Sequence, residues 1–291
     1  MKSSSNGVSD EAMLYLVGTP IGNLEDITRR ATRVLGEVAI IYAEDTRKSR
    51  MLLSHLEIFN KVVSRYSEHT HFKSTQDVLA QLGLGRSVAL VTDAGMPSVS
   101  DPGSHLVRAV VAAGYRVVVV PGPTAESAAV ALSGVVEGPY LFMGFMRSNR
   151  SWLEGYVSAA AGVNAALVGY LAPHDISKVL GGLAELLGFD ASAVICREIT
   201  KIYEDRMEGT LAELLGHPRV EVPKGEYVLV VPASSLHAAE AVDDSLFKQV
   251  VALCADSSAT RSERAKRIAA LTGLPRSDVY EALGGLTSRP L

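Results

Sequence analysis

The sequence predicts an α/β protein with two α/β domains and a small helical region at its C-terminal end. Its 291 residues exceed what one hydrophobic core usually serves. Residues 13–121 alternate short apolar runs with amphipathic stretches, and residues 122–236 do so less regularly. Continuous apolar strands separated by helices indicate a parallel sheet that is covered on both faces. We therefore expect a parallel sheet in the first domain and a mixed sheet in the second.

The first domain, residues 13–121, contains five strand-like runs. They are "MLYLVG" (13–18), "VAIIYA" (38–43), "VVSRY" (62–66), "SVALVTD" (87–93) and "YRVVVVP" (115–121). Amphipathic segments such as "DITRRATRVLGE" and "GSHLVRAVVAAG" lie between these runs and predict helices.

The second domain, residues 122–236, contains four strand-like runs. They are "YLFMGFM" (140–146), "NAALVGYLA" (164–172), "AVICREI" (193–199) and "EYVLVVP" (226–232). The segment "KIYEDRMEG" (201–209) is a further candidate, expected to lie antiparallel to its neighbours.

The remaining segments are interpreted as a tail, a linker and a helical region. Residues 1–12 are expected to form a flexible tail, and the small, polar residues 232–244 to form a linker. Residues 245–291 carry three short helical patterns. Gly273 and Pro275 separate the last two, which predicts a small helical hairpin.

The composition excludes several classes of protein. A net charge of −4 does not indicate a general nucleic-acid binder. Two cysteines and seven scattered histidines provide neither a disulfide framework nor metal-ligand spacing, so we expect no metal. The polar N-terminal stretch lacks an apolar signal core, and no apolar run approaches the roughly 18 residues of a membrane span. We therefore expect a cytoplasmic protein.

Unusual loops follow four strands of the predicted parallel sheet. The carboxyl ends of parallel strands are where such sheets bind ligands. Glycine allows a ligand to approach the backbone, and proline fixes a loop before binding; the same residues also make ordinary turns and helix caps. Because four such loops share one edge, we interpret them as a rigid pocket for an adenosyl-like molecule. The loops are Gly18–Asn23, Ala43–Arg47, Thr92–Gly103 and Pro121–Ala125.

The first of these loops excludes two common nucleotide-binding motifs. Gly18 and Gly22 do not give the G-x-G-x-x-G pattern of dinucleotide-binding proteins, and no G-K-[ST] follows them. A nicotinamide-dependent dehydrogenase and a P-loop enzyme are both disfavoured.

Charged residues follow strands in both predicted domains. Glu44, Asp45, Thr46 and Arg47 come directly after an apolar run, where ionisable groups are costly to bury unless they pair or meet a polar ligand. This quartet is either a helix cap with a solvated arginine or an acidic pair with a phosphate-binding arginine. In the second domain, "REITK" (197–201) and "KGE" (224–226) are either surface turns or parts of a site.

As an ordered set, these motifs resemble the bacterial small-subunit ribosomal RNA 2′-O-ribose methyltransferases of the tetrapyrrole-methylase-like superfamily. The resemblance extends over nearly the whole chain from Leu14 onward. The motifs that carry it are "GTPIGNLEDITRRA", "AEDTRKSRMLL", "VTDAGMPSVSDPG", "VVPGPTA", "CREITKIYED" and "KGEYVLVV".

The resemblance implies a class III methyltransferase fold and an enzyme that uses S-adenosyl-L-methionine. It implies 2′-O-methylation of a cytidine ribose in the decoding region of 16S rRNA, with the 30S ribosomal subunit as partner. It also implies a homodimer and a cofactor held in the cleft between the two domains. The cofactor-binding residues that it implies are Pro20, Gly22, Asp93, Ala94, Gly95, Pro121, Gly122, Pro123 and Thr124.

For the substrate side, the resemblance implies two further groups of residues. We expect a catalytic centre that removes the proton of the ribose hydroxyl, and a set of RNA-binding residues. The catalytic residues are expected to be Glu44, Asp45, Glu198 and Lys201. The RNA-binding residues are expected to be Asn23, Thr46, Arg47, Asp101 and Arg197.

The chain departs from the family pattern in its second domain. Where the family usually reads like "FYESPHRL", this chain has "GYLAPHDI", so Leu171 replaces a glutamate and Asp175 an arginine. The loop "MRSNRS" (146–151) is also less basic than usual. These changes affect the expected RNA-contacting surface more than the cofactor pocket.

Two other functions remain open from the sequence. The first is a tetrapyrrole methyltransferase, although those enzymes usually open with G-x-G-P-G-D instead of the "TPIGN" of residues 19–23. The second is a ribosome-binding relative that retains the pocket but has little activity, which the altered "GYLAPHDI" stretch favours.

Overall fold

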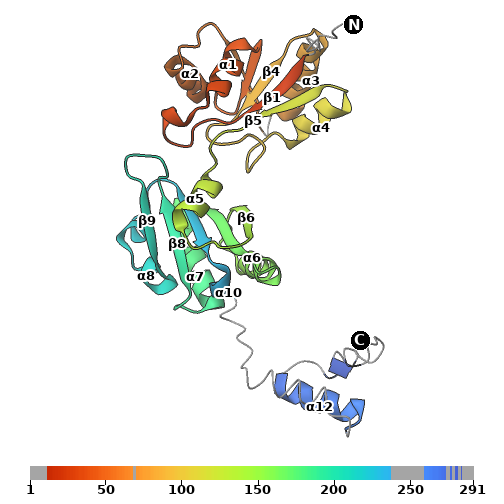
Figure 1. Cartoon of the computed structure of the whole chain (residues 1–291), viewed down its shortest axis with the longest axis vertical. Helices are drawn as coiled ribbons and strands as arrows, with labels where there is room; N and C mark the ends of the chain where they lie inside the picture. Colours follow the sequence, from red (N-terminus) through yellow and green to blue (C-terminus); the bar gives the residue numbers. More distant parts are fainter. Residues whose placement is uncertain are drawn as a thin grey trace, which may run out of the picture. The chain divides into compact units, whose positions relative to one another are not determined.

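The computed structural model describes residues 12–67, 70–236 and 259–272, together with Arg276, Val279, Tyr280 and Leu283. The chain divides into two compact units, Met1–Leu236 and His237–Leu291. The first unit contains two five-stranded sheets (Figure 1).

The first sheet is parallel throughout, as predicted. Its strand order is β3-β2-β4-β1-β5, and the central strand β4 is fully buried. The apolar runs of the sequence become these strands because both faces of the sheet are covered. The strands are β1 (Met13–Val17), β2 (Ile40–Ala43), β3 (Val62–Arg65), β4 (Val88–Val91) and β5 (Arg116–Val120).

Four helices cover the two faces of the first sheet. Leu35 and Leu53, from α1 (Arg29–Glu37) and α2 (Thr46–His55), pack with Val91 on one face. On the other face, α3 (His71–Gly83) and α4 (Ser104–Ala112) contribute to the core that surrounds Leu90. A short 3-10 helix, η1 (Leu24–Asp26), precedes α1.

The second sheet is mixed, as predicted, with strand order β6-β7-β10-β8-β9. β6 and β7 are parallel, and the other pairs are antiparallel. The candidate strand in "KIYEDRMEG" is confirmed as β9, although its first residues form a turn before the strand begins. The strands are β6 (Tyr140–Phe145), β7 (Ala166–Leu171), β8 (Ser192–Arg197), β9 (Asp205–Thr210) and β10 (Tyr227–Val231).

Helices also cover both faces of the second sheet. One face packs against α5 (Ala125–Ser133), whose Ala129 lies in a core with Val168 and Val230. The other face packs mainly against α6 and α7, and the remaining helices are short. These elements are α6 (Arg150–Gly162), η2 (Pro173–Asp175), α7 (Ile176–Leu187), α8 (Leu211–Leu215), α9 (Pro218–Glu221) and α10 (Ala233–Leu236).

The second unit is described mainly through one helix, α12 (Arg261–Thr272). Its Ala265 and Ile268 form a small apolar cluster with Val279 and Leu283. The predicted linker is a helix, α10, over its first residues, and its remainder lies outside the described residues. The helical pattern before residue 257 also lies outside them, as does most of the last one. None of the described helices is long and apolar enough to cross a membrane.

Three loops at the carboxyl edge of the first sheet are joined by their backbones. Gly18, directly after β1, donates its N–H to the carbonyl of Val120 over 3.0 Å. Thr19 and Gly95 exchange a pair of N–H···O bonds of 2.9 and 3.0 Å. A Cβ atom built on Gly18 would lie 2.6 Å from the backbone nitrogen of Gly122, so these two loops touch with no room for a side chain.

This close approach predicts that Gly122→Ala is strongly destabilising. The new Cβ would lie 2.8 Å from the Cα of Gly18, and backbone atoms cannot move aside as a flexible side chain can. We expect a loss of about 1–3 kcal/mol in the free energy of unfolding, measured by chemical denaturation. Gly36→Ala is the matched control. Gly36 lies in α1 with no atom within 4 Å of an added Cβ, so this change should leave stability unchanged or raise it.

Candidate active site at the carboxyl edge of the first sheet

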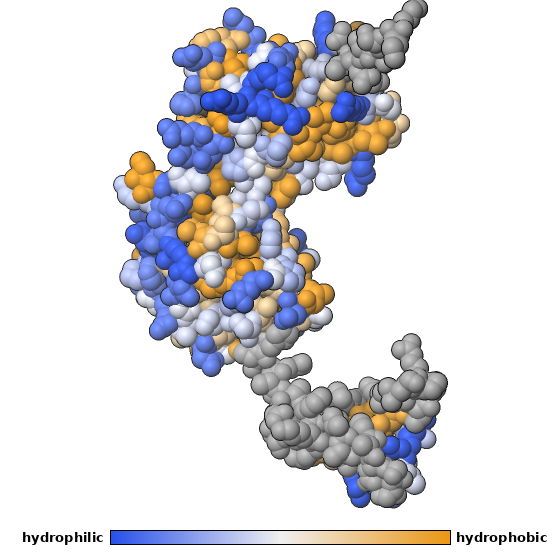
Figure 2. All heavy atoms as spheres, in the orientation of Figure 1, coloured by the Kyte–Doolittle hydropathy of each residue, from blue (hydrophilic) through white to orange (hydrophobic). Residues whose placement is uncertain are grey.

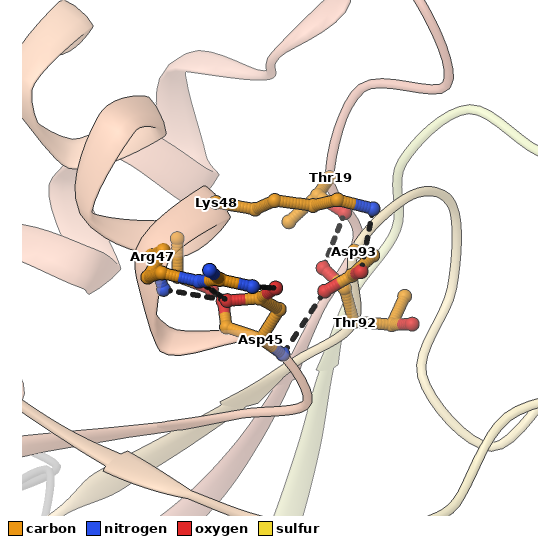
Figure 3. Close-up of polar contacts among 7 residues, drawn as sticks. Thr19, Asp45, Arg47, Lys48, Thr92 and Asp93 are labelled. Carbon is orange, nitrogen blue, oxygen red and sulfur yellow. Dashed lines mark hydrogen bonds and ion pairs between the residues drawn. The ribbon is translucent and has the colours of Figure 1, made fainter.

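Asp93 joins two of the four loops at the carboxyl edge. It follows β4, and its Oδ1 atom accepts the backbone N–H of Asp45 over 3.1 Å. Its Oδ2 atom pairs with the ammonium of Lys48 at 2.8 Å (Figure 3). The hydroxyl of Thr19 donates to the carbonyl of Thr92 over 3.2 Å, which brings the first loop to the same place. These contacts bring the loops after β1, β2 and β4 together at one edge of the sheet, as expected for a parallel sheet.

Asp45 acts as the N-cap of α2. Its Oδ1 atom accepts the N–H of Arg47 over 2.8 Å, and its Oδ2 atom pairs with the guanidinium of Arg47 at 3.1 Å. These hydrogen bonds from Arg47 lower the pKa of Asp45 to about 2. The side chain of Arg47 is 86% exposed, so it can contact a ligand in addition to Asp45. Asp45 is therefore a helix cap, which was one of the two interpretations of this quartet. The catalytic role of Asp45 stays a prediction.

Glu44 and Asp101 form an acidic pair beside Asp93. Burial raises the pKa of Glu44, and the charges of Asp101 and Asp93 raise it further, while Lys48 offsets part of this effect. Burial also raises the pKa of Asp101. The Thr92 hydroxyl lies nearby and lowers both values somewhat, but it is buried and makes no hydrogen bond of ordinary length to a described residue. Glu44 is thus a carboxylate with increased basicity.

Lys201 is the centre of a second charged cluster, contributed by the second sheet. Its ammonium lies 2.9 Å from Oε1 of Glu198 and 3.0 Å from Oε2 of Glu226. Burial alone would lower the pKa of Lys201, but the hydrogen bonds to these two carboxylates outweigh it, so the pKa is raised. Lys201 is therefore a cation at neutral pH, suited to stabilise negative charge and poorly suited to accept a proton.

The loop that carries Lys201 has a constrained backbone. Glu198 and Thr200 have φ values of 50° and 68°, in the left-handed region that residues with side chains rarely adopt. Glu198 is held in this conformation because its Oε1 atom also accepts the N–H of Glu226 over 2.9 Å. Gly22 packs against this loop, since a Cβ on Gly22 would lie 2.6 Å from Cγ of Lys201. The first loop of one sheet thus positions the lysine of the other.

A largely apolar cavity lies between the carboxyl-edge loops and the second sheet, and we call it the first cavity. It encloses about 240 Å³. The loop after β4 contributes Asp93, Gly95 and Asp101 to its wall. The second sheet contributes apolar and aromatic side chains, which are Phe145, Tyr170, Leu171, Tyr227 and Val228.

A buried carboxylate completes the wall of the first cavity. Glu126, in the first turn of α5, is only 9% exposed, and its Oε2 atom accepts the hydroxyl of Tyr170 over 2.5 Å. Burial raises the pKa of Tyr170, and the bond to Glu126 raises it further, so this hydroxyl remains a donor. No ion pair joins Glu126 to a lysine or arginine among the residues that the structure describes. Asp93 of this wall pairs with Lys48, so Asp101 and Glu126 are the carboxylates of the wall that have no ion pair in the described part of the chain.

The structure brings most of the predicted cofactor residues to cavity walls. Asp93, Ala94, Gly95 and Thr124 line the first cavity. Thr124 also lines a neighbouring second cavity, together with Pro121, Gly122 and Pro123. Pro20 and Gly22 line neither, and Gly22 acts through its contact with Lys201.

The predicted RNA-binding residues are more scattered. Asn23 caps η1 by accepting the N–H of Glu25 over 3.0 Å, and Thr46 begins α2. Arg197 is buried and donates to the carbonyls of Lys224 and Tyr203 over 2.9 and 3.3 Å, an arrangement that supports the loop. Asp101 lies in the first cavity, whereas Asn23 and Arg47 are exposed to solvent, so the RNA-binding roles stay predictions.

Four residues of this region were not predicted as site residues. They are Lys48, Glu126, Tyr170 and Glu226. Lys48 lies inside the quoted motif "AEDTRK", and Glu226 lies inside "KGE", which the sequence left open as a surface turn or part of a site. Glu126 and Tyr170 are 44 residues apart, and only the fold joins them.

The fold agrees with comparisons to known proteins. Residues 13–215 match the family model of the Tetrapyrrole (Corrin/Porphyrin) Methylases, so the chain is a methyltransferase of this class. A relative from Bacillus subtilis (strain 168), named ribosomal RNA small subunit methyltransferase I, is 37% identical over 96% of each chain. A relative of the same name from Mesorhizobium japonicum is 38% identical over 94% of this chain and 92% of its own. The chain therefore belongs to the family of ribosomal RNA small subunit methyltransferases I.

Solved structures support the fold class alone. A crystal structure of diphthine synthase aligns with a TM-score of 0.62 and 17% identity, covering 80% of this chain and 96% of its own. The methyltransferase CobJ aligns with a TM-score of 0.59 and 21% identity, covering 76% of this chain and 95% of its own. The predicted class III methyltransferase fold is confirmed.

The raised pKa of Glu44 predicts that this carboxylate lowers stability at neutral pH. The folded state prefers protonated Glu44, so stability is lost as the pH rises from the ordinary value of 4.5 through the folded pKa. We expect Glu44→Gln to raise Tm at pH 7.5 by on the order of 1–2 °C, with no gain below about pH 4.5. Thermal unfolding across this range measures it. A gain in Tm that is equal at all pH values would contradict the explanation.

Proposed function

We propose that this protein transfers the methyl group of S-adenosyl-L-methionine to the 2′ hydroxyl of a cytidine in the decoding region of 16S rRNA. The proposal that the cofactor is S-adenosyl-L-methionine rests on one observation, the acidic wall of the first cavity, which adjoins the charged cluster of Lys201. The substrate half rests on the names of relatives that match over nearly the whole chain. A ribosomal substrate implies that the protein acts in the cytoplasm, and the homodimer is proposed from the resemblance.

The first cavity suits a cationic cofactor with a planar ring. S-adenosyl-L-methionine carries a positively charged sulfur, an ammonium group and an adenine ring. The carboxylates of Asp101 and Glu126 form no ion pair with a described residue, unlike Asp93, which pairs with Lys48, and this favours a positively charged ligand. Aromatic and aliphatic side chains such as Tyr227 and Val228 suit the adenine ring.

The charged clusters suit removal of a proton from the acceptor hydroxyl. When bound, the cofactor supplies a methyl group on a sulfonium sulfur, a good leaving group. The acceptor oxygen would supply the electron pair of the new bond to that carbon, and the pair of the broken carbon–sulfur bond would remain on sulfur. Glu44, with its raised pKa, takes the hydroxyl proton, and the cation of Lys201 stabilises the developing negative charge on oxygen. Glu198 and Glu226 hold Lys201 in its charged state.

The proposal is tested with 30S subunits from cells that lack this protein. Purified protein and radiolabelled S-adenosyl-L-methionine should place a methyl group in 16S rRNA, at a ribose that then resists alkaline cleavage. Transfer to a uroporphyrinogen-type macrocycle, with none to 16S rRNA, would instead indicate a tetrapyrrole methyltransferase. Cofactor binding without transfer to either substrate would indicate a ribosome-binding relative.

The assigned roles predict different effects of two substitutions on the rate of methyl transfer. We expect Glu44→Gln to lower kcat by about 100-fold or more and to abolish the fall in rate at acidic pH, since the base is gone. We expect Lys201→Met to lower kcat at all pH values, because it removes the cation without removing the base. Rates near wild type in both variants would refute this assignment. Cofactor affinity, measured in parallel, shows whether each variant is folded.

The charge of Glu126 is predicted to contribute to cofactor affinity. Glu126→Gln keeps the side-chain shape and an acceptor for Tyr170, but removes the buried negative charge. We expect Kd for S-adenosyl-L-methionine to rise about tenfold, measured by titration calorimetry. Glu154→Gln is the matched control, because Glu154 is exposed, pairs with Arg150 and lines neither cavity. Equal affinities in the two variants would contradict the role of Glu126.

A further inference from the structure

A second cavity adjoins the first one at the carboxyl edge. It encloses about 720 Å³, within the range of small-ligand sites, and opens to solvent. Its wall combines the β1–α1 loop, the loop after β5 and the beginning of α5. The lining residues that matter here are Asp26, Thr28, Thr124, Ser127 and Thr200.

The two cavities share part of their walls. Ile21, Met96 and Thr124 line both of them. A group bound in the second cavity therefore lies beside whatever the first cavity holds. This is the relation that a methyl acceptor needs to a methyl donor, because the reacting atoms must come into contact.

The chemistry of the second cavity suits a ligand rich in hydroxyl groups. Its polar side chains are four hydroxyls and one carboxylate, and no lysine or arginine lies among its lining residues. The Oδ2 atom of Asp26 and the Oγ1 atom of Thr200 are buried without a hydrogen-bond partner in the described part of the chain. Buried polar atoms nearly always have such a partner, so two orphans among the residues that line one cavity leave hydrogen-bonding capacity for a ligand. A ribose hydroxyl can donate to the carboxylate of Asp26 and pair with the hydroxyl of Thr200.

Two arginines directly follow a residue that lines the second cavity. Thr28, which lines it, caps α1, and Arg29 and Arg30 follow directly as the first residues of that helix. Both are exposed, and the side chain of neither forms an ion pair or hydrogen bond in the described ranges. Figure 2 shows hydrophilic residues interspersed with hydrophobic ones over the region of α1 and α2. Arginine binds phosphate strongly, and the positive end of a helix adds to this attraction.

We propose that the second cavity receives the ribonucleoside that accepts the methyl group, and that Arg29 and Arg30 bind the phosphates on either side of it. This inference rests on the proposed function, because it requires that the first cavity holds the methyl donor. It assigns the hydroxyls and Asp26 to the sugar and base, and the exposed arginines to the backbone of the strand. Recognition thus combines a neutral pocket with a basic rim.

A substitution that fills the second cavity tests the proposal. Ser127 is exposed and lines only this cavity, so Ser127→Trp places an indole ring in it without disturbing the core. We expect kcat/KM for 30S subunits to fall at least 20-fold, while Kd for S-adenosyl-L-methionine changes less than twofold. Ala131→Trp is the matched control on the same helix, because Ala131 is exposed and lines neither cavity. It should behave as wild type in both measurements.

The arginines are tested through the salt dependence of binding. Arg30→Ala should raise KM for 30S subunits and reduce the slope of log affinity against log salt by about one. Arg33→Ala is the control, because Arg33 lies one turn further along α1 and pairs with Glu37 at 2.7 Å. Its slope should match that of the wild type.

Three outcomes would overturn the inference. Normal methyl transfer by Ser127→Trp would show that the acceptor lies elsewhere. A parallel loss of cofactor affinity in that variant would show that the second cavity belongs to the cofactor. Equal slopes of log affinity against log salt for Arg30→Ala and Arg33→Ala would show that Arg30 binds no phosphate. Failure of the proposed function itself is distinguishable, since wild-type protein would then transfer no methyl group to 16S rRNA.

Discussion

The contact between the backbones of Gly18 and Gly122 is the constraint on which the site depends. It sets the distance between the loops after β1 and β5 at the closest approach that two chains allow. Thr19, one residue on, is thereby placed to exchange hydrogen bonds with Gly95, which fixes the loop after β4. The two cavities lie around this junction and share Ile21, Met96 and Thr124 as walls. A wider spacing of the loops would merge or displace both cavities, so the glycines determine the geometry although neither has a group that can react.

The charges of the site are arranged for ligands more than for stability. Lys201 and Lys48 are neutralised by carboxylates, and Glu226 acts on both lysines. Glu44 and Asp101, in contrast, are partly buried beside other acids, which disfavours their charged forms. Such an uncompensated arrangement is costly in an empty protein and becomes favourable when a cation binds. The left-handed backbone at Glu198 and Thr200 adds to this pattern, because strain of this kind persists where the surroundings enforce it.

Much of the fold could be predicted from the sequence, because continuous apolar runs separated by helices have few other solutions. The edge loops followed from the same logic, since parallel strands end at one side of a sheet. The roles of individual charged residues could not be predicted. Both arginines come at the end of an apolar run in the sequence, yet Arg197 is the last residue of β8 and is buried against carbonyls, while Arg47 lies in the first turn of α2 and extends into solvent. Glu126 resembles an ordinary acid in the first turn of a helix, and only β7 places Tyr170 over it. Such pairings depend on which loops and helices the second sheet brings together, which no local pattern encodes.

The junction of Gly18 and Gly122 also affects what the sequences of relatives can reveal. Contacts between side chains leave a trace when a change on one side is compensated by a change on the other. Here a Cβ on either residue meets the backbone of its neighbour, which no substitution can make smaller. We therefore expect both positions to be invariant, and two invariant positions show no covariation. The contact that organises the site would be invisible to any method that infers proximity from correlated substitutions.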